Sequence, residues 1–131
     1  MPSRILLIAL ATLALALTAP AAALAHRDDR DVRVSGTCGR GATSKLRLTA
    51  KDGAIRVEFE VRSRRGGERW RVVLVHERRV AWRGRARTRS GSGSFRVRRS
   101  LPDFGGADQV TARASGPRGN ICQAGGVLTG A

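Results

Sequence analysis

A strict alternation of apolar and charged residues over residues 55–62 is the feature that most limits what this chain can fold into. The apolar members are Ile55, Val57, Phe59 and Val61. Successive side chains of a β-strand point to opposite faces, so a period of two predicts a strand with one buried face and one solvated face. An amphipathic helix needs a period near 3.6 and does not fit this segment.

Similar short segments, separated by turn signals, occur along the rest of the chain. Asp52-Gly53 is the strongest of these signals, because both residue types tolerate the positive φ angles of a tight hairpin. We expect eight strands, over residues 32–35, 45–50, 55–62, 70–75, 80–87, 95–101, 110–115 and 121–127. The pattern predicts an all-β fold, a single Greek-key antiparallel β-sandwich of seven or eight strands.

The first 25 residues have the pattern of a secretory signal peptide. Arg4 supplies the positive start, residues 5–19 are uncharged, and Ala23-Leu24-Ala25 offers the small residues that cleavage requires. We expect a signal peptide at 1–25, a charged tail at 26–31 and the sandwich at 32–131, in a protein secreted after cleavage behind Ala25. The alternative is an uncleaved anchor, because residues 5–25 are just long enough to span a bilayer.

The chain holds two cysteines, Cys38 and Cys122, which allow one pairing. In an exported protein an even cysteine count indicates a disulfide. A bond that closes so long a loop is expected to stabilise the fold by on the order of 4 kcal/mol. Free or redox-active thiols are the alternative, and the spacing does not match the CxxC pattern of such sites.

The formal net charge is +15, and removing Arg4 with the signal peptide leaves 24 basic and 10 acidic residues. Most of the excess lies between Arg62 and Arg99, where fourteen arginines stand against Glu68 and Glu77. A charge of this size favours attraction to anionic surfaces, or solubility through self-repulsion.

Five arginines are candidate ligands for a polyanion. A period of two places three of them on one face of one predicted strand and two on one face of the next. They are Arg83, Arg85 and Arg87, then Arg96 and Arg98. Guanidinium groups suit phosphate and sulfate, so wall teichoic acids, anionic lipid headgroups or acidic polysaccharides are the expected partners. The alternative is that these charges protect sheet edges from aggregation. Nucleic acid is not expected as a partner. Binding of single strands needs exposed aromatic side chains, and both tryptophans occupy strand positions that are expected to face the core.

The sequence offers no pattern for catalysis. His26 lies in the charged tail, and His76 falls at an expected exposed turn, where strand alternation directs Glu77 to the opposite face. The serines of residues 90–94 lack the glycine spacing of a nucleophile elbow. We therefore expect neither an enzyme nor a cofactor.

No metal site is expected either. Asp28, Asp29 and Asp31 offer carboxylates for calcium, but the arginines between them favour solvated ion pairs. Copper at His26 is a narrower alternative, and it requires cleavage behind Ala23 so that His26 becomes the third residue.

From Leu46 onward, the predicted strands resemble the A-B-C-C′-E-F-G order of immunoglobulin-like and fibronectin type III-like sandwiches, with Trp70 opening the third strand. The chain is also similar to small secreted sandwich proteins of unknown role from GC-rich Gram-positive bacteria. The segments that carry the resemblance are Gly36-Thr37-Cys38, residues 55–61, residues 69–72, Gly93-Ser94-Phe95 and residues 110–114. The chain departs from immunoglobulin domains in having no tyrosine and in the position of its cysteines. In such a fold the first and last strands are neighbours, so the resemblance implies a disulfide that joins the two ends of the domain.

A sandwich of this shape serves many unrelated functions. We expect a monomeric, non-enzymatic binding or structural module with no membrane span after cleavage. The alternative function is inhibition of an extracellular enzyme, with the loop at 63–67 or 87–94 as the inserting segment.

Overall fold

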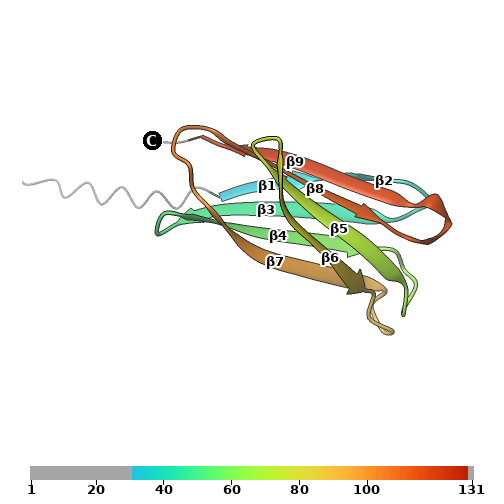
Figure 1. The fold of residues 1–131 in the computed structure, drawn as a ribbon. Coiled ribbons are helices and arrows are strands. Elements are labelled where there is room, and N and C mark those ends of the chain that lie inside the picture. The colour runs from blue at the N-terminus through green and yellow to red at the C-terminus, as the bar shows by residue number, and fades with distance from the viewer. Residues whose placement is uncertain (1–30, 130–131) are drawn as a thin grey trace, which may run out of the picture.

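The computed structural model describes residues 31–129, which form two antiparallel β-sheets packed face to face (Figure 1). The expected signal peptide at 1–25 lies outside the described residues, as does the tail up to residue 30. The nine strands are β1 Asp31–Ser35, β2 Thr37–Cys38, β3 Thr43–Lys51, β4 Ala54–Arg62, β5 Arg69–His76, β6 Arg79–Arg87, β7 Ser94–Pro102, β8 Asp108–Ser115 and β9 Ile121–Leu128.

The all-β sandwich is therefore confirmed, with one strand more than expected. The additional strand is β2, which lies where the sequence predicted a loop. One sheet has the order β1-β3-β4-β7 and the other the order β2-β9-β8-β5-β6. The only helical turn in residues 31–129 is η1 at Pro117–Gly119, and no helix in that range is long and apolar enough to cross a membrane.

The core lies between the two sheets and consists of the inward members of the alternating segments. Phe59 and Leu48 are fully buried on the four-stranded sheet, and Val72 and Leu74 face them from the five-stranded sheet. Trp70 of β5 meets Phe95 of β7 with 5.9 Å between ring centroids, a contact that joins the two sheets. Burying each such side chain contributes about 1.5–3 kcal/mol, so the alternation supplies the main stabilising term.

Two hairpins use turns in which both central residues have positive φ. Asp52 and Gly53 have φ angles of 52° and 74° between β3 and β4, so the Asp-Gly prediction is confirmed. Glu77 and Arg78 have φ angles of 49° and 64° between β5 and β6. Neither of these is a glycine, and the left-handed conformation costs such residues about 1–2 kcal/mol each.

The two cysteines form the predicted disulfide. Cys38 of β2 and Cys122 of β9 are directly opposite one another in the antiparallel register, with their Cα atoms 4.1 Å apart. A short Cα separation is typical of the non-hydrogen-bonded pairs of an antiparallel ladder. The bond therefore joins the first strand of the five-stranded sheet to the last strand of the chain.

The connection after β6 is rich in glycine and serine, but hydrogen bonds hold its backbone in place. The backbone N–H of Arg89 donates to the carbonyl of Ser94 at 2.9 Å, and the N–H of Gly93 donates to the carbonyl of Arg89 at 2.8 Å. Gly93 adopts a φ of 63° and is buried against the backbone of Arg64. These bonds give the segment a defined, closed turn.

Candidate polyanion-binding surface

The five arginines predicted to bind a polyanion do not share one face of the sandwich. β6 and β7 are edge strands of different sheets. Arg83, Arg85 and Arg87 point outward from the five-stranded sheet, whereas Arg96 and Arg98 point outward from the four-stranded sheet. Alternation gives the face of a strand correctly, but it does not say which sheet that strand joins.

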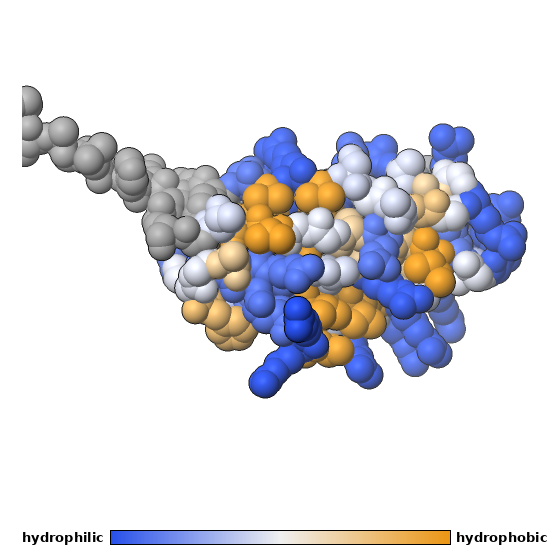
Figure 2. Space-filling view, turned by 90° about the horizontal axis from the view of Figure 1, so that it is seen from above, coloured by the Kyte–Doolittle hydropathy of each residue, from blue (hydrophilic) through white to orange (hydrophobic). Residues whose placement is uncertain are grey.

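The outer face of the five-stranded sheet gathers six exposed arginines, which we call the arginine face. Its members are Arg69 and Arg71 of β5, Arg83, Arg85 and Arg87 of β6, and Arg113 of β8. No carboxylate occupies an outward strand position of this sheet in residues 31–129. Seen from above, the molecule is strongly hydrophilic over much of its surface, with apolar side chains in small groups between (Figure 2).

The register places arginines directly opposite one another on this face. Arg69 is opposite Arg87 and Arg71 is opposite Arg85. Like charges in directly opposed positions destabilise an antiparallel pair. In the described part of the chain, none of these four arginines has an ion pair that would offset the repulsion. An arrangement that opposes stability in this way is expected at a functional surface.

The four-stranded sheet differs because carboxylates stand among its cations. Arg96 forms ion pairs with Glu58 and Glu60, and Arg98 lies 3.6 Å from Glu58. The hydrogen bond from Arg96, with a second from Arg62, lowers the pKa of Glu60 and keeps that carboxylate ionised. Arg96 and Arg98 are therefore partly neutralised within the protein, although this face also carries more cations than carboxylates.

Asp31, one of the three carboxylates considered above as calcium ligands, lies on the same sheet. Arg47 donates hydrogen bonds of 3.1 and 2.8 Å to its carboxylate, which lower the pKa of Asp31, and Arg33 adds a weaker ion pair at 3.5 Å. Asp31 thus takes part in ion pairs, as expected for this segment. It also belongs to β1 rather than to the charged tail, whereas Asp28 and Asp29 lie outside the described residues.

A cleft of about 380 Å³ separates the edges of β6 and β7, and we call it the edge cleft. Six arginines and no acidic residue line it, together with apolar side chains that include Trp82 and Phe95. The arginines are Arg85, Arg87, Arg89, Arg96, Arg98 and Arg99. The cleft therefore brings together four of the five arginines predicted from the sequence, along one edge of the sandwich.

Arg99 is not among the five arginines predicted from the sequence, although its place in the alternation of β7 is unusual for a charged residue. Arg99 follows Val97 by two residues, so it occupies a position of β7 that faces the other sheet. An apolar residue is expected at such a position. Its guanidinium lies 4.4 Å from the ring centroid of Trp82, a cation–π contact. Trp82 itself faces inward as predicted but is only half-buried. An inward charge on an edge strand also protects that edge from pairing with the sheet of another molecule.

The arginines at outward positions of β5, β6 and β8 thus form one cationic face, and the edge cleft extends it around the side of the sandwich. Comparisons of the chain with protein families, with curated proteins and with solved structures find no match, so its function is inferred from this surface.

Proposed function

We propose that the protein is an exported, non-enzymatic module that binds anionic polymers through its arginine face. The observation that carries the proposal is the pair of directly opposed arginines, Arg69 with Arg87 and Arg71 with Arg85, on a face without carboxylates. A polyanion relieves the repulsion between these charges when it binds. Because these four arginines form no ion pair within the described residues, the polymer does not have to break one in order to bind.

The geometry of the face favours a linear polymer over a single small anion. Arginines two residues apart on β6 repeat at about 7 Å along the strand, and opposed arginines start about 5 Å apart across the sheet. Such rows match phosphate or sulfate groups that recur along an extended chain, and each guanidinium can bind one of them through two hydrogen bonds. Arg85 and Arg87 belong to both the arginine face and the edge cleft, so one bound polymer can contact both.

The proposed location is outside the cell. The signal-peptide pattern at residues 1–25 supports export, and the disulfide supports an oxidising compartment. Wall teichoic acids, anionic lipid headgroups and acidic polysaccharides are the polyanions that such a protein meets. We assign no nucleic-acid ligand, because Trp70 is buried and the Arg99 guanidinium lies over the half-buried ring of Trp82.

The sandwich is proposed to be of the fibronectin type III-like kind. The strand orders β3-β4-β7 and β6-β5-β8-β9 support this, because they correspond to A-B-E and C′-C-F-G when the strands are lettered from Leu46 onward. β1 and β2 then extend the two sheets beyond strands A and G. This assignment concerns shape, and it carries no activity with it.

The proposal predicts that binding depends on the arginine face more than on net charge. Replacing Arg71, Arg83, Arg85 and Arg87 by Ser should weaken binding to heparin or purified teichoic acid about 100-fold at low salt, if each exposed contact contributes about 0.7 kcal/mol. Salt-gradient elution from a heparin column and titration with the polymer measure this change.

The matched control removes the same number of charges from the four-stranded sheet, outside the edge cleft, by replacing Arg33, Lys45, Arg56 and Arg62 by Ser. This variant should bind close to wild type, apart from a small loss through long-range charge. Equal weakening of both variants would mean that only net charge matters, and the proposed surface would be wrong.

A second candidate function, inhibition of an extracellular enzyme, gains support from the loops at one end of the sandwich. Thr88 is buried, its hydroxyl donates to the carbonyl of Arg65 at 2.6 Å, and it accepts the backbone N–H of Glu68 at 2.8 Å. The N–H of Ser63 donates to the carbonyl of Gly93 at 2.9 Å. These bonds fix the loop at 63–67 against the loop at 87–94, and a rigid loop is what protease inhibition needs.

Trypsin digestion distinguishes this candidate from polyanion binding. The exposed Arg64 and Arg65 lie at the tip of the fixed loop, so an inhibitor would resist cleavage there and slow the hydrolysis of a small reporter substrate. A module that only binds polyanions would leave the reporter rate unchanged. Cleavage at Arg64 or Arg65 at the rate of an unstructured peptide would exclude inhibition by this loop.

A further inference from the structure

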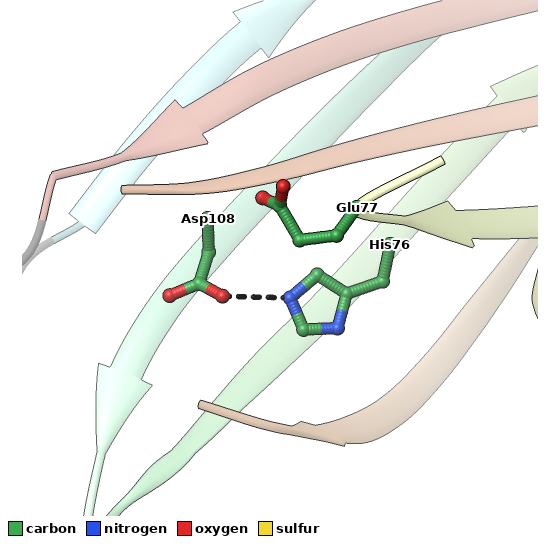
Figure 3. Close-up of side chains that lie close together, drawn as sticks. All are labelled: His76, Glu77 and Asp108. Atoms are coloured by element: carbon green, nitrogen blue, oxygen red, sulfur yellow. Dashed lines mark hydrogen bonds and ion pairs between the residues drawn. The ribbon is translucent and has the colours of Figure 1, made fainter. Parts of the chain in front are cut away.

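At the end of β5 the structure buries a histidine that the sequence placed at an exposed turn. His76 is only 3% exposed and Asp108, the first residue of β8, is 2% exposed. The Nε2 atom of His76 lies 2.8 Å from Oδ1 of Asp108 (Figure 3). The expectation of a surface histidine was wrong because β5 continues through His76 with its inward parity intact, and the chain turns only at Glu77 and Arg78.

The turn also places Glu77 differently from the sequence expectation. With a φ of 49°, Glu77 leaves the strand conformation, so alternation no longer directs its side chain away from His76. Its carboxylate stands beside the imidazole and the Asp108 carboxylate (Figure 3), and one ligand atom from each of the three residues lies within 4.8 Å of the others. The backbone N–H of Gln109 donates to Oε1 of Glu77, which leaves Oε2 for another partner.

We propose that His76, Glu77 and Asp108 form a binding site for a zinc ion. Ligand atoms of a tetrahedral zinc site lie roughly 3.3 Å apart, as follows from metal–ligand bonds of about 2.0–2.1 Å. Zinc binding therefore requires the three ligand atoms, which lie within 4.8 Å of one another, to move closer together. One neutral imidazole and two carboxylates offset the charge of the divalent ion, and water occupies the fourth position, which leaves the site open.

The donor set selects for zinc over calcium or magnesium. Those ions require shells of six or more ligands that are almost entirely oxygen, whereas an imidazole nitrogen favours zinc and neighbouring transition metals. Without metal, Nε2–H of His76 donates to the Asp108 carboxylate, which only accepts. In the zinc-bound state Nε2 binds the ion and the imidazole carries its hydrogen on Nδ1.

The surroundings of the site allow entry from one side and hold the ligands on the other. The Phe104 ring stacks on the His76 ring with 4.5 Å between centroids and 4° between planes, and the Phe104 N–H donates to Asp108 at 3.4 Å. Glu77 is exposed, so the ion reaches the site from its side. Arg78 follows in the same turn and Arg79 begins β6, and both reduce the affinity for a cation through repulsion.

Calorimetric titration of the disulfide-bonded protein with ZnCl₂ tests the proposal. The substitution His26→Ala is made first in all proteins, because His26 is the only other histidine. We expect saturable binding of one zinc ion and no response to CaCl₂. Glu77→Gln preserves the acceptor for the Gln109 N–H, so it should leave the unfolding transition in place and weaken zinc binding roughly 10- to 100-fold. Glu68→Gln removes a carboxylate just before β5, at the opposite end of this strand from His76, and should leave zinc binding unchanged.

Nitrogen NMR of the His76 ring separates a site from adventitious binding. Zinc should shift Nε2 strongly and move the ring hydrogen to Nδ1. The proposal is overturned if no saturable zinc binding occurs, if Glu77→Gln binds zinc as tightly as its parent, or if the His76 ring signals do not change.

Discussion

Replacing Cys38 and Cys122 together by Ser is expected to lower the free energy of unfolding by about 4–5 kcal/mol. The bond closes a loop between residues 84 positions apart, and chain-entropy estimates for loops of that length give this magnitude. A loss of this size is a large share of the stability of a domain with about 100 residues. Guanidinium unfolding curves of the oxidised parent and of the double variant measure it directly.

Chemical reduction provides the control for this substitution. The parent protein unfolded in the presence of a reductant should have the same midpoint as the double Ser variant, since both lack the same cross-link. Neither treatment touches the arginine face, which lies on β5, β6 and β8, so salt-dependent binding should persist below the lowered midpoint. A loss of less than 1 kcal/mol would mean that the hydrogen bonds between β2 and β9 already hold the ends of the domain together.

Trp70→Ala is expected to cost about 3–5 kcal/mol, the range found for removing a buried aromatic ring. Trp70 is 1% exposed, meets Phe95 across the two sheets, and packs so closely on Gly116 that a Cβ atom there would lie 2.5 Å from its indole ring. Denaturant unfolding, followed by circular dichroism because one of the two tryptophans is lost, gives the change.

Trp70→Phe is the matched variant. The indole Nε1–H is buried and has no hydrogen-bond partner within residues 31–129, and an unmade hydrogen bond of this kind costs about 1–3 kcal/mol. Phe removes that unsatisfied donor while keeping most of the apolar ring, so its net cost should fall below about 1.5 kcal/mol. We assign a destabilising effect to the unpaired indole N–H. If Trp70→Phe lowered the stability as much as Trp70→Ala, this assignment would be wrong.

Eight of the nine strands could be predicted from the sequence because they depend on local alternation. β4 begins within a residue of its predicted start, and β6 extends only one residue further than expected. The Asp52-Gly53 turn was equally clear, since its residue types are those that a positive φ requires. The disulfide was predicted from the cysteine count together with the expected signal peptide. Each of these inferences needs information from only a few neighbouring residues, or from composition.

What the sequence could not show depends on pairing between distant segments. β2 has two residues, too few for any period, and it exists because Cys38 meets Cys122. Arg96 has the same outward parity as Arg85, yet it lies beside Glu58 and Glu60 because β7 pairs with β4. His76 and Asp108 are 32 residues apart and meet only because β5 and β8 are neighbours in one sheet. No spacing rule along the chain would find such a cluster.

The position of the cross-link also determines how the domain responds to mechanical tension. A force applied to the two ends of the folded region passes along β1 and β2 to Cys38, across the sulfur atoms to Cys122, and out along β9. The polypeptide between the two cysteines lies outside this load path, so stretching can peel away only the terminal strands. Pulling therefore leaves the strands that carry the arginine face enclosed in a covalent loop.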